Sequence, residues 1–161
     1  MSNSLAIFSH STASALRFMV EHENWDRAVL TTAWFIDQVN HWFDLMCSRS
    51  PTTALSLYDQ EKYRSAVRFL QKFKEMFETV QIGGGEFKPV QTGIILSTAS
   101  ILDLQHRLLH NEGYKFVLTS RFTQDSLENF FSTVRQRNPI PTPLEFKCAL
   151  RIIAMAQYLR H

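Results

Sequence analysis

Apolar residues recur at every third or fourth position along almost the whole chain, which is the spacing that α-helices produce. The strict alternation typical of half-buried strands is nearly absent. The 161 residues are enough for one ordinary globular unit, and an apolar content of 45% supplies the surface that helices need to bury. We therefore predict a mainly all-α fold with at most one short strand.

Three helices are expected in the first half of the chain. The first carries an apolar stripe over residues 5–19, and Asn24 offers a cap for a second helix over 25–47. The third covers 59–80, and glycines 83–85 are expected to end it because glycine adopts left-handed conformations at little cost. One side of this third helix is basic and consists of Lys62, Arg64, Arg68 and Lys72.

Three further helices and the one strand are expected in the second half. Residues 92–110 are apolar on most sides, which is typical of a central, buried helix. Residues 114–118 are the strand candidate. Thr123 is predicted to cap the next helix, and a capping box that starts at Thr142 begins the last one. The helix after Thr123 has an apolar face made of Leu127, Phe130, Phe131 and Val134.

Composition and common motifs exclude several classes of protein. The net charge of +2 neither requires nor excludes nucleic acid, and no secretory signal or membrane span is recognisable, so an intracellular protein is expected. Cys47 and Cys148 lie far apart without a CxxC pair, which predicts reduced, mostly buried thiols. The glycine run lacks the lysine of a phosphate-binding loop, and His106 and His110 lack the glutamate of a zinc-binding HExxH motif.

Two carboxylates are the residues that most suggest chemistry. Asp125 and Glu128 are three residues apart, so a helix starting after Thr123 places them on one ridge beside the apolar face. The spacing alone is equally compatible with ordinary surface charge, because an acidic residue in the first turn interacts favourably with the helix dipole. Periodicity therefore leaves both interpretations open.

The surrounding residues resemble a known family. The run LTSRFTQDSLENFFSTVRQRNPIPTPLEFKCALR resembles the C-terminal part of the P-element type transposases, in which a QDxLExFF motif precedes an arginine and an NPTP-like loop. FKPVQTGIILSTASILDL resembles the link into that region. FSHSTASALRFMV and TTAWFIDQVNHWFDLMCSRS resemble the end of the family's GTP-binding insertion domain. The resemblance implies insertion-domain helices over 1–85 and the C-terminal helices of an RNase H-like domain over 86–161.

The resemblance also implies roles for individual residues. In the family, three carboxylates hold two magnesium ions for DNA strand cleavage and transfer, and Glu128 matches the glutamate of that set, which makes it the candidate catalytic and metal-binding residue. Asp125 matches an aspartate near the bound GTP and its magnesium. Phe43 and Asp44 match the start of an FDxxN pattern that helps to hold the nucleotide. The implied partner is transposon-end DNA in the nucleus, and a homo-oligomer is compatible with the family.

The sequence departs from the family pattern in two places. Cys47 stands where the pattern has asparagine, and a thiol is a weak hydrogen-bond donor and acceptor, so GTP binding is expected to be impaired. The two other carboxylates of the metal set should come from strands, whereas four candidate aspartates lie in or beside predicted helices: Asp37, Asp44, Asp59 and Asp103. We therefore expect no transposase activity from this chain alone.

Three functional hypotheses follow from these observations. The first is a fragment or truncated derivative of a P-element-like transposase that needs missing upstream residues for catalysis. The second is a non-catalytic helical module derived from such a transposase. It would bind DNA through the basic side of the third helix and the cluster of Arg135, Gln136 and Arg137, or a protein through apolar surface that the missing sheet leaves exposed. The third is a guanine-nucleotide-binding protein without transposition chemistry, which would require Phe43, Asp44 and Asp125 to converge.

Overall fold

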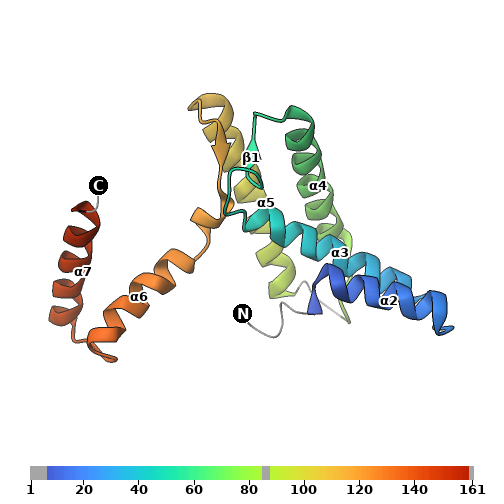
Figure 1. The fold of residues 1–161 in the computed structure, drawn as a ribbon, viewed down its shortest axis with the longest axis horizontal. Coiled ribbons are helices and arrows are strands. Elements are labelled where there is room, and N and C mark those ends of the chain that lie inside the picture. Colours follow the sequence, from blue (N-terminus) through green and yellow to red (C-terminus); the bar gives the residue numbers. More distant parts are fainter. Residues whose placement is uncertain (1–6, 85–87, 160–161) are drawn as a thin grey trace. The chain divides into compact units, whose positions relative to one another are not determined.

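A computed structural model describes residues 7–84 and 88–159. The chain forms two compact units, Met1–Ser120 and Arg121–His161, each described by itself below. Helices dominate both units, as Figure 1 shows, and the predicted mainly all-α class is confirmed. Leu5 and Gly85, which belong to the predicted first stripe and glycine run, lie outside the described residues. No described helix is long and apolar enough to cross a membrane.

The first unit begins with two packed helices, α2 (His10–His22) and α3 (Val29–Met46). Ser9 caps α2, since its hydroxyl oxygen accepts a hydrogen bond from the backbone N–H of Thr12 at 3.2 Å. Ala13 and Ala33 are fully buried at the contact, together with Ile36. The small side chains of Ala13 and Ala33 let the two helices pack closely.

The expected start of the second helix is wrong. Asn24 has a φ of 55°, so it adopts the left-handed conformation that follows a helix end and not the extended conformation of an N-cap. The backbone N–H of Trp25 donates to the carbonyl of Met19, which closes the end of α2. A turn stabilised by the carboxylate of Asp26, which accepts from the N–H of Ala28 at 2.9 Å, delays α3 to Val29.

The main core of the first unit lies where α3 meets α4 (Gln60–Thr79) and α5 (Pro89–His106). Asp59 caps α4 by accepting from the N–H of Lys62 at 3.0 Å, so the helix begins within one residue of the expected start. The indole N–H of Trp42 donates to the Thr98 hydroxyl at 2.8 Å, so the polar atom of this buried ring is satisfied. The buried cluster consists of Val39, Trp42, Leu55, Ala66, Leu70, Phe73, Phe77 and Ile101.

Two expectations about α4 and α5 are wrong. α4 ends at Thr79 with Val80 in an extended conformation, and Gly83 takes its left-handed φ of 71° in the turn beyond the helix end. α5 starts earlier than expected, at Pro89, and is not buried on all sides: Leu96 is 61% exposed. Four residues of α5 are buried, and one of them is Ile101. The other three have polar side chains that form hydrogen bonds within the core: Gln91, Thr98 and Gln105. A short π-helix, Arg107–Asn111, follows α5.

A two-stranded antiparallel sheet completes the first unit. The strand candidate over 114–118 corresponds to β2 (Phe116–Val117), which pairs with β1 (Leu55–Ser56), a segment that the sequence analysis did not single out. Beside it, Thr119 binds the end of α3: its hydroxyl donates to the carbonyl of Leu45 at 2.7 Å and accepts from the N–H of Ser48 at 2.9 Å. A 3₁₀ helix, Thr119–Phe122, leads out of this unit.

The second unit contains α6 (Asp125–Arg137) and α7 (Pro143–Tyr158). The predicted capping box at the start of α7 is confirmed, since a Glu145 carboxylate oxygen accepts from the backbone N–H of Thr142 at 2.8 Å. This bond lowers the pKa of Glu145 below its ordinary range. At the other helix, Gln124 and not Thr123 occupies the N-cap position, so the start is shifted by one residue.

The expected burial of the α6 face is only partly observed. Val134 is buried, but Leu127 is 61% exposed and Phe131 is 42% exposed. Two helices alone offer too little apolar surface to cover such a face. Cys47 and Cys148 are both exposed, which contradicts the expectation of buried thiols.

The carboxylate of Asp37 in α3 gives a pH-dependent stability prediction. A hydrogen bond from the Arg17 guanidinium, supported by His10, holds the pKa of Asp37 below its ordinary value of 3.8 although burial opposes this. A carboxyl group whose pKa is lower in the folded than in the unfolded state stabilises the fold at pH values above its ordinary pKa. This stabilisation is lost as the pH falls through the folded-state pKa. We expect Asp37→Asn to cost roughly 1 kcal/mol at neutral pH and almost nothing in strong acid. Urea unfolding of the wild-type and Asp37→Asn proteins, from neutral pH to strong acid, measures this difference in the free energy of unfolding. A difference that stays constant over the whole pH range would contradict the prediction.

Candidate functional site

The two candidate carboxylates lie in the first turn of α6. Asp125 is the first residue of the helix, and Glu128 follows one turn later, so both point from the exposed surface at the positive end of the helix dipole. The side-chain amide of Gln124 donates to a Glu128 carboxylate oxygen at 2.7 Å. This contact orients Glu128 and leaves its second oxygen available to a ligand in the described geometry.

The candidate nucleotide-binding residues lie at the end of α3. Phe43 is half-buried, and its ring packs edge-on against Trp42 with centroids 5.1 Å apart. Asp44 is exposed, and one of its carboxylate oxygens accepts a hydrogen bond from the side-chain amide of Asn40 at 3.3 Å. Cys47 occupies the C-cap, where its N–H donates to the carbonyl of Phe43 at 2.9 Å.

The structure therefore brings the candidate residues together in two separate pairs. Phe43 and Asp44 share α3 in the first unit, whereas Asp125 and Glu128 share α6 in the second. The convergence of Asp44 with Asp125, on which a GTP site depends, stays a prediction. The predicted division into insertion-domain helices over 1–85 and RNase H-like helices over 86–161 also stays a prediction. In the structure, α5 packs against α4 across that boundary.

The donor set within the described residues is too small for the implied magnesium pair. A two-metal site needs several carboxylates that clamp both ions, and no group of three or more His, Cys, Asp or Glu side chains suited to a metal occurs in residues 7–84 and 88–159. Four aspartates that precede the motif lie on helices or at a helix cap, as the sequence predicts: Asp37, Asp44, Asp59 and Asp103.

The donor set for GTP is also incomplete. The resemblance implies an asparagine where this chain has Cys47, and a thiol cannot replace a carboxamide that both donates and accepts hydrogen bonds. The amide of Asn40, one turn before Asp44, is engaged with that carboxylate. Neither the implied magnesium pair nor the implied GTP fits the described residues alone.

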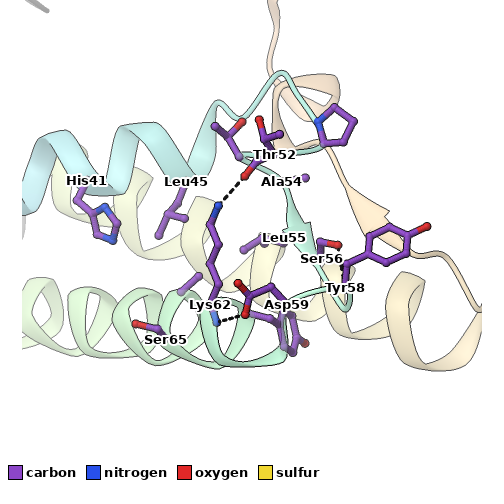
Figure 2. A pocket seen from close by; sticks show the side chains of 14 residues that line it. His41, Leu45, Thr52, Ala54, Leu55, Ser56, Tyr58, Asp59, Lys62 and Ser65 are labelled. Atoms are coloured by element: carbon purple, nitrogen blue, oxygen red, sulfur yellow. Dashed lines mark hydrogen bonds between the residues drawn. The ribbon is translucent and has the colours of Figure 1, made fainter.

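A pocket in the first unit was not anticipated. It has a volume of about 440 Å³ and lies between the end of α3, the 51–58 segment and the start of α4. Figure 2 shows Lys62 crossing this pocket, where its ammonium donates to the Thr52 carbonyl at 2.5 Å. Leu45 and Leu55 contribute apolar walls. The sequence signal was the cluster of turn residues before the Asp59 cap, but turn residues alone do not distinguish a pocket from a connection.

A hydrogen-bonded group borders the pocket on one side. The Tyr63 hydroxyl donates to the side-chain oxygen of Gln105 at 2.6 Å and lies 3.0 Å from Nε2 of His110. Burial raises the pKa of Tyr63 above its ordinary value of 10.0, and the bond to Gln105 partly opposes this. The group fixes the start of α4 to the end of α5, and its role is structural.

Comparison with known proteins gives two matches over most of the chain. It is 32% identical over 152 residues to the Transposable element P transposase of Drosophila melanogaster, a match that covers 90% of this chain and 20% of that protein. It also matches a chain of the Drosophila P element transposase strand transfer complex, with a TM-score of 0.73 and 29% identity over 90% of this chain and 34% of that one. No family model matches the chain.

These matches define the chain as a relative of transposases. More particularly, it is homologous to a segment of a P-element type transposase, and the resemblance seen in the QDSLENFF region is thereby confirmed. The chain spans about one fifth of the curated relative and about one third of the solved chain.

Proposed function

We propose that this chain is a segment or truncated derivative of a P-element-like DNA transposase, in which Glu128 supplies one carboxylate of a magnesium site for DNA strand cleavage and transfer. The observation that carries the proposal is the match over 90% of the chain, together with the position of Glu128 within QDSLENFF. The exposed carboxylates in the first turn of α6 support it, since a metal ligand must be accessible.

The same proposal includes the dependence on other residues. Asp125 is the candidate ligand of the magnesium that accompanies GTP, and the described residues hold no group of three or more His, Cys, Asp or Glu side chains suited to a metal. We propose that the two other carboxylates of the catalytic set are supplied by a segment beyond the described residues. We therefore propose that the isolated chain is not catalytic. Its DNA partner is transposon-end DNA, which is consistent with the strand transfer complex formed by the solved relative, and its compartment is the nucleus.

The alternative is a non-catalytic module that binds DNA or a protein. The specific observation in its favour is the row of exposed, basic side chains on α4. A nucleotide-binding role for Phe43, Asp44 and Asp125 is the weakest of the three hypotheses, because Cys47 replaces the amide that the family pattern uses.

The reading frame upstream of Met1 separates the first two hypotheses. Sequencing the full-length transcript is expected to show an in-frame segment with alternating apolar strands that carry two aspartates. Such strands are what an RNase H-like metal site needs beside Glu128. A stop codon directly before Met1 in every transcript would contradict the catalytic proposal and favour the non-catalytic module.

A further inference from the structure

We propose that three exposed cations on α4, Arg64, Arg68 and Lys72, form a surface that binds the phosphate backbone of duplex DNA. We call this surface the α4 ridge. The inference rests on the relation to transposases that the proposed function and its alternative share, because it assigns to this segment a DNA contact that is separate from Glu128. It concerns only residues of the first unit, so it does not depend on how the two units are placed.

The α4 ridge is long enough to reach several phosphates of a DNA strand. Its three residues are four positions apart, so they follow one line along the helix, on the side away from the buried Ala66, Leu70 and Phe73. A rise of 1.5 Å per residue separates neighbouring cations by about 6 Å and gives the α4 ridge a length of roughly 12 Å. Duplex DNA carries one phosphate per about 3.4 Å of axis on each strand, so this length spans about three or four phosphates.

The charges of the α4 ridge are not neutralised within the part of the chain that the structure describes. The Arg64 guanidinium donates to the neutral side-chain oxygen of Gln60 at 3.2 Å, and none of the three cations makes an ion pair with a described residue. Lys74 on the same helix differs, since its ammonium pairs with Glu78 at 2.7 Å. Like charges four residues apart destabilise a helix, so the arrangement has a cost that a bound anion would remove.

Lys62 does not belong to the α4 ridge, although the sequence placed it on the same basic side. Figure 2 shows its side chain directed across the pocket to Thr52. Two acidic residues do lie near the α4 ridge, Glu61 before Arg64 and Glu75 after Lys72. Neither glutamate forms an ion pair with the α4 ridge, but both reduce the positive potential around it. Neutralising these two glutamates therefore provides a second test of the inference.

The test measures the salt dependence of DNA binding. Fluorescence anisotropy with a labelled duplex, in EDTA so that no metal chemistry contributes, compares the full chain with the double variant Arg68→Gln/Lys72→Gln. Each lost phosphate contact makes the slope of log affinity against log salt shallower by about 0.9, so a change of about 1.8 is expected. The matched control is Lys74→Gln/Arg107→Gln, which removes two cations that already pair with Glu78 and Glu112. It should keep the wild-type slope.

Two further variants make the result specific. Glu61→Gln/Glu75→Gln should tighten DNA binding, because it removes the negative charge beside the α4 ridge. Lys72→Arg should bind as the wild type does, which separates charge from fold. A ridge variant with the wild-type slope, a wild-type chain that does not bind DNA, or stronger binding to an RNA duplex of the same sequence would each overturn the inference. Because EDTA excludes metal, a failure here is distinct from a failure of the Glu128 proposal.

Discussion

Phe73→Ala is expected to lower the free energy of unfolding by about 3–5 kcal/mol. Phe73 is only 3% exposed, and its ring stacks on Trp42 with centroids 5.6 Å apart and also contacts Phe69 and Phe77. Removing the ring loses the transfer free energy of a buried aromatic side chain and leaves a cavity between α3 and α4. Urea unfolding followed by circular dichroism measures the loss.

Phe131→Ala is the matched control for this substitution. The spacing of the sequence predicted Phe131 as a core residue, but its side chain is 42% exposed in the second unit. The same truncation is therefore expected to cost less than about 2 kcal/mol. Equal losses at the two positions would contradict the assignment of the core to α3, α4 and α5, and would mean that the α6 face is covered in the folded protein.

Local sequence rules predicted the helices whose ends are set by a single side chain. The capping box of Thr142 and Glu145 depends on hydrogen bonds within a few residues, so the sequence contains all the information needed. Asn24 shows the limit of such rules. Asparagine favours both the N-cap and the left-handed position after a helix, and only the structure shows that it ends α2.

Contacts between residues far apart in the sequence determine features of the fold that local periodicity does not predict. The apolar composition of 92–110 predicted a helix buried on all sides, whereas α5 buries a mostly polar stripe whose partners come from distant residues, such as Trp42 for Thr98 and Tyr63 for Gln105. β1 was missed for a similar reason, since Leu55 and Ser56 form a strand only because Phe116 and Val117 lie beside them. Such pairings are not visible in a local pattern.

The roles proposed for the site residues come from the family resemblance more than from helical periodicity. Periodicity placed Asp125 and Glu128 on one ridge, and the structure confirms that they share the first turn of α6, but ordinary surface carboxylates would look the same. The match to P element transposase is what gives Glu128 its proposed role. The pocket beside Lys62 was missed because it is formed by segments from two helices and a loop.

Glu128→Gln is expected to have the largest functional effect. In a longer polypeptide that adds the proposed upstream segment with two aspartates, the substitution replaces the carboxylate that we propose as a metal ligand by a neutral amide of the same size. It keeps the oxygen that accepts from the Gln124 side chain, so the local fold should not change. A metal ion stabilises transition-state charge by several kcal/mol, and its loss should reduce DNA cleavage by about 100-fold or more. Glu21→Gln, an exposed glutamate of α2, is the matched control.

The most direct measurement is magnesium-dependent cleavage of transposon-end DNA by four proteins: the isolated chain, the longer polypeptide, and the longer polypeptide with Glu128→Gln or Glu21→Gln. The account predicts cleavage by the longer polypeptide and its Glu21→Gln variant, and none by the isolated chain or the Glu128→Gln variant. Full cleavage by the Glu128→Gln variant, or metal-dependent cleavage by the isolated chain, would contradict the role proposed for Glu128 and the dependence of this segment on upstream carboxylates.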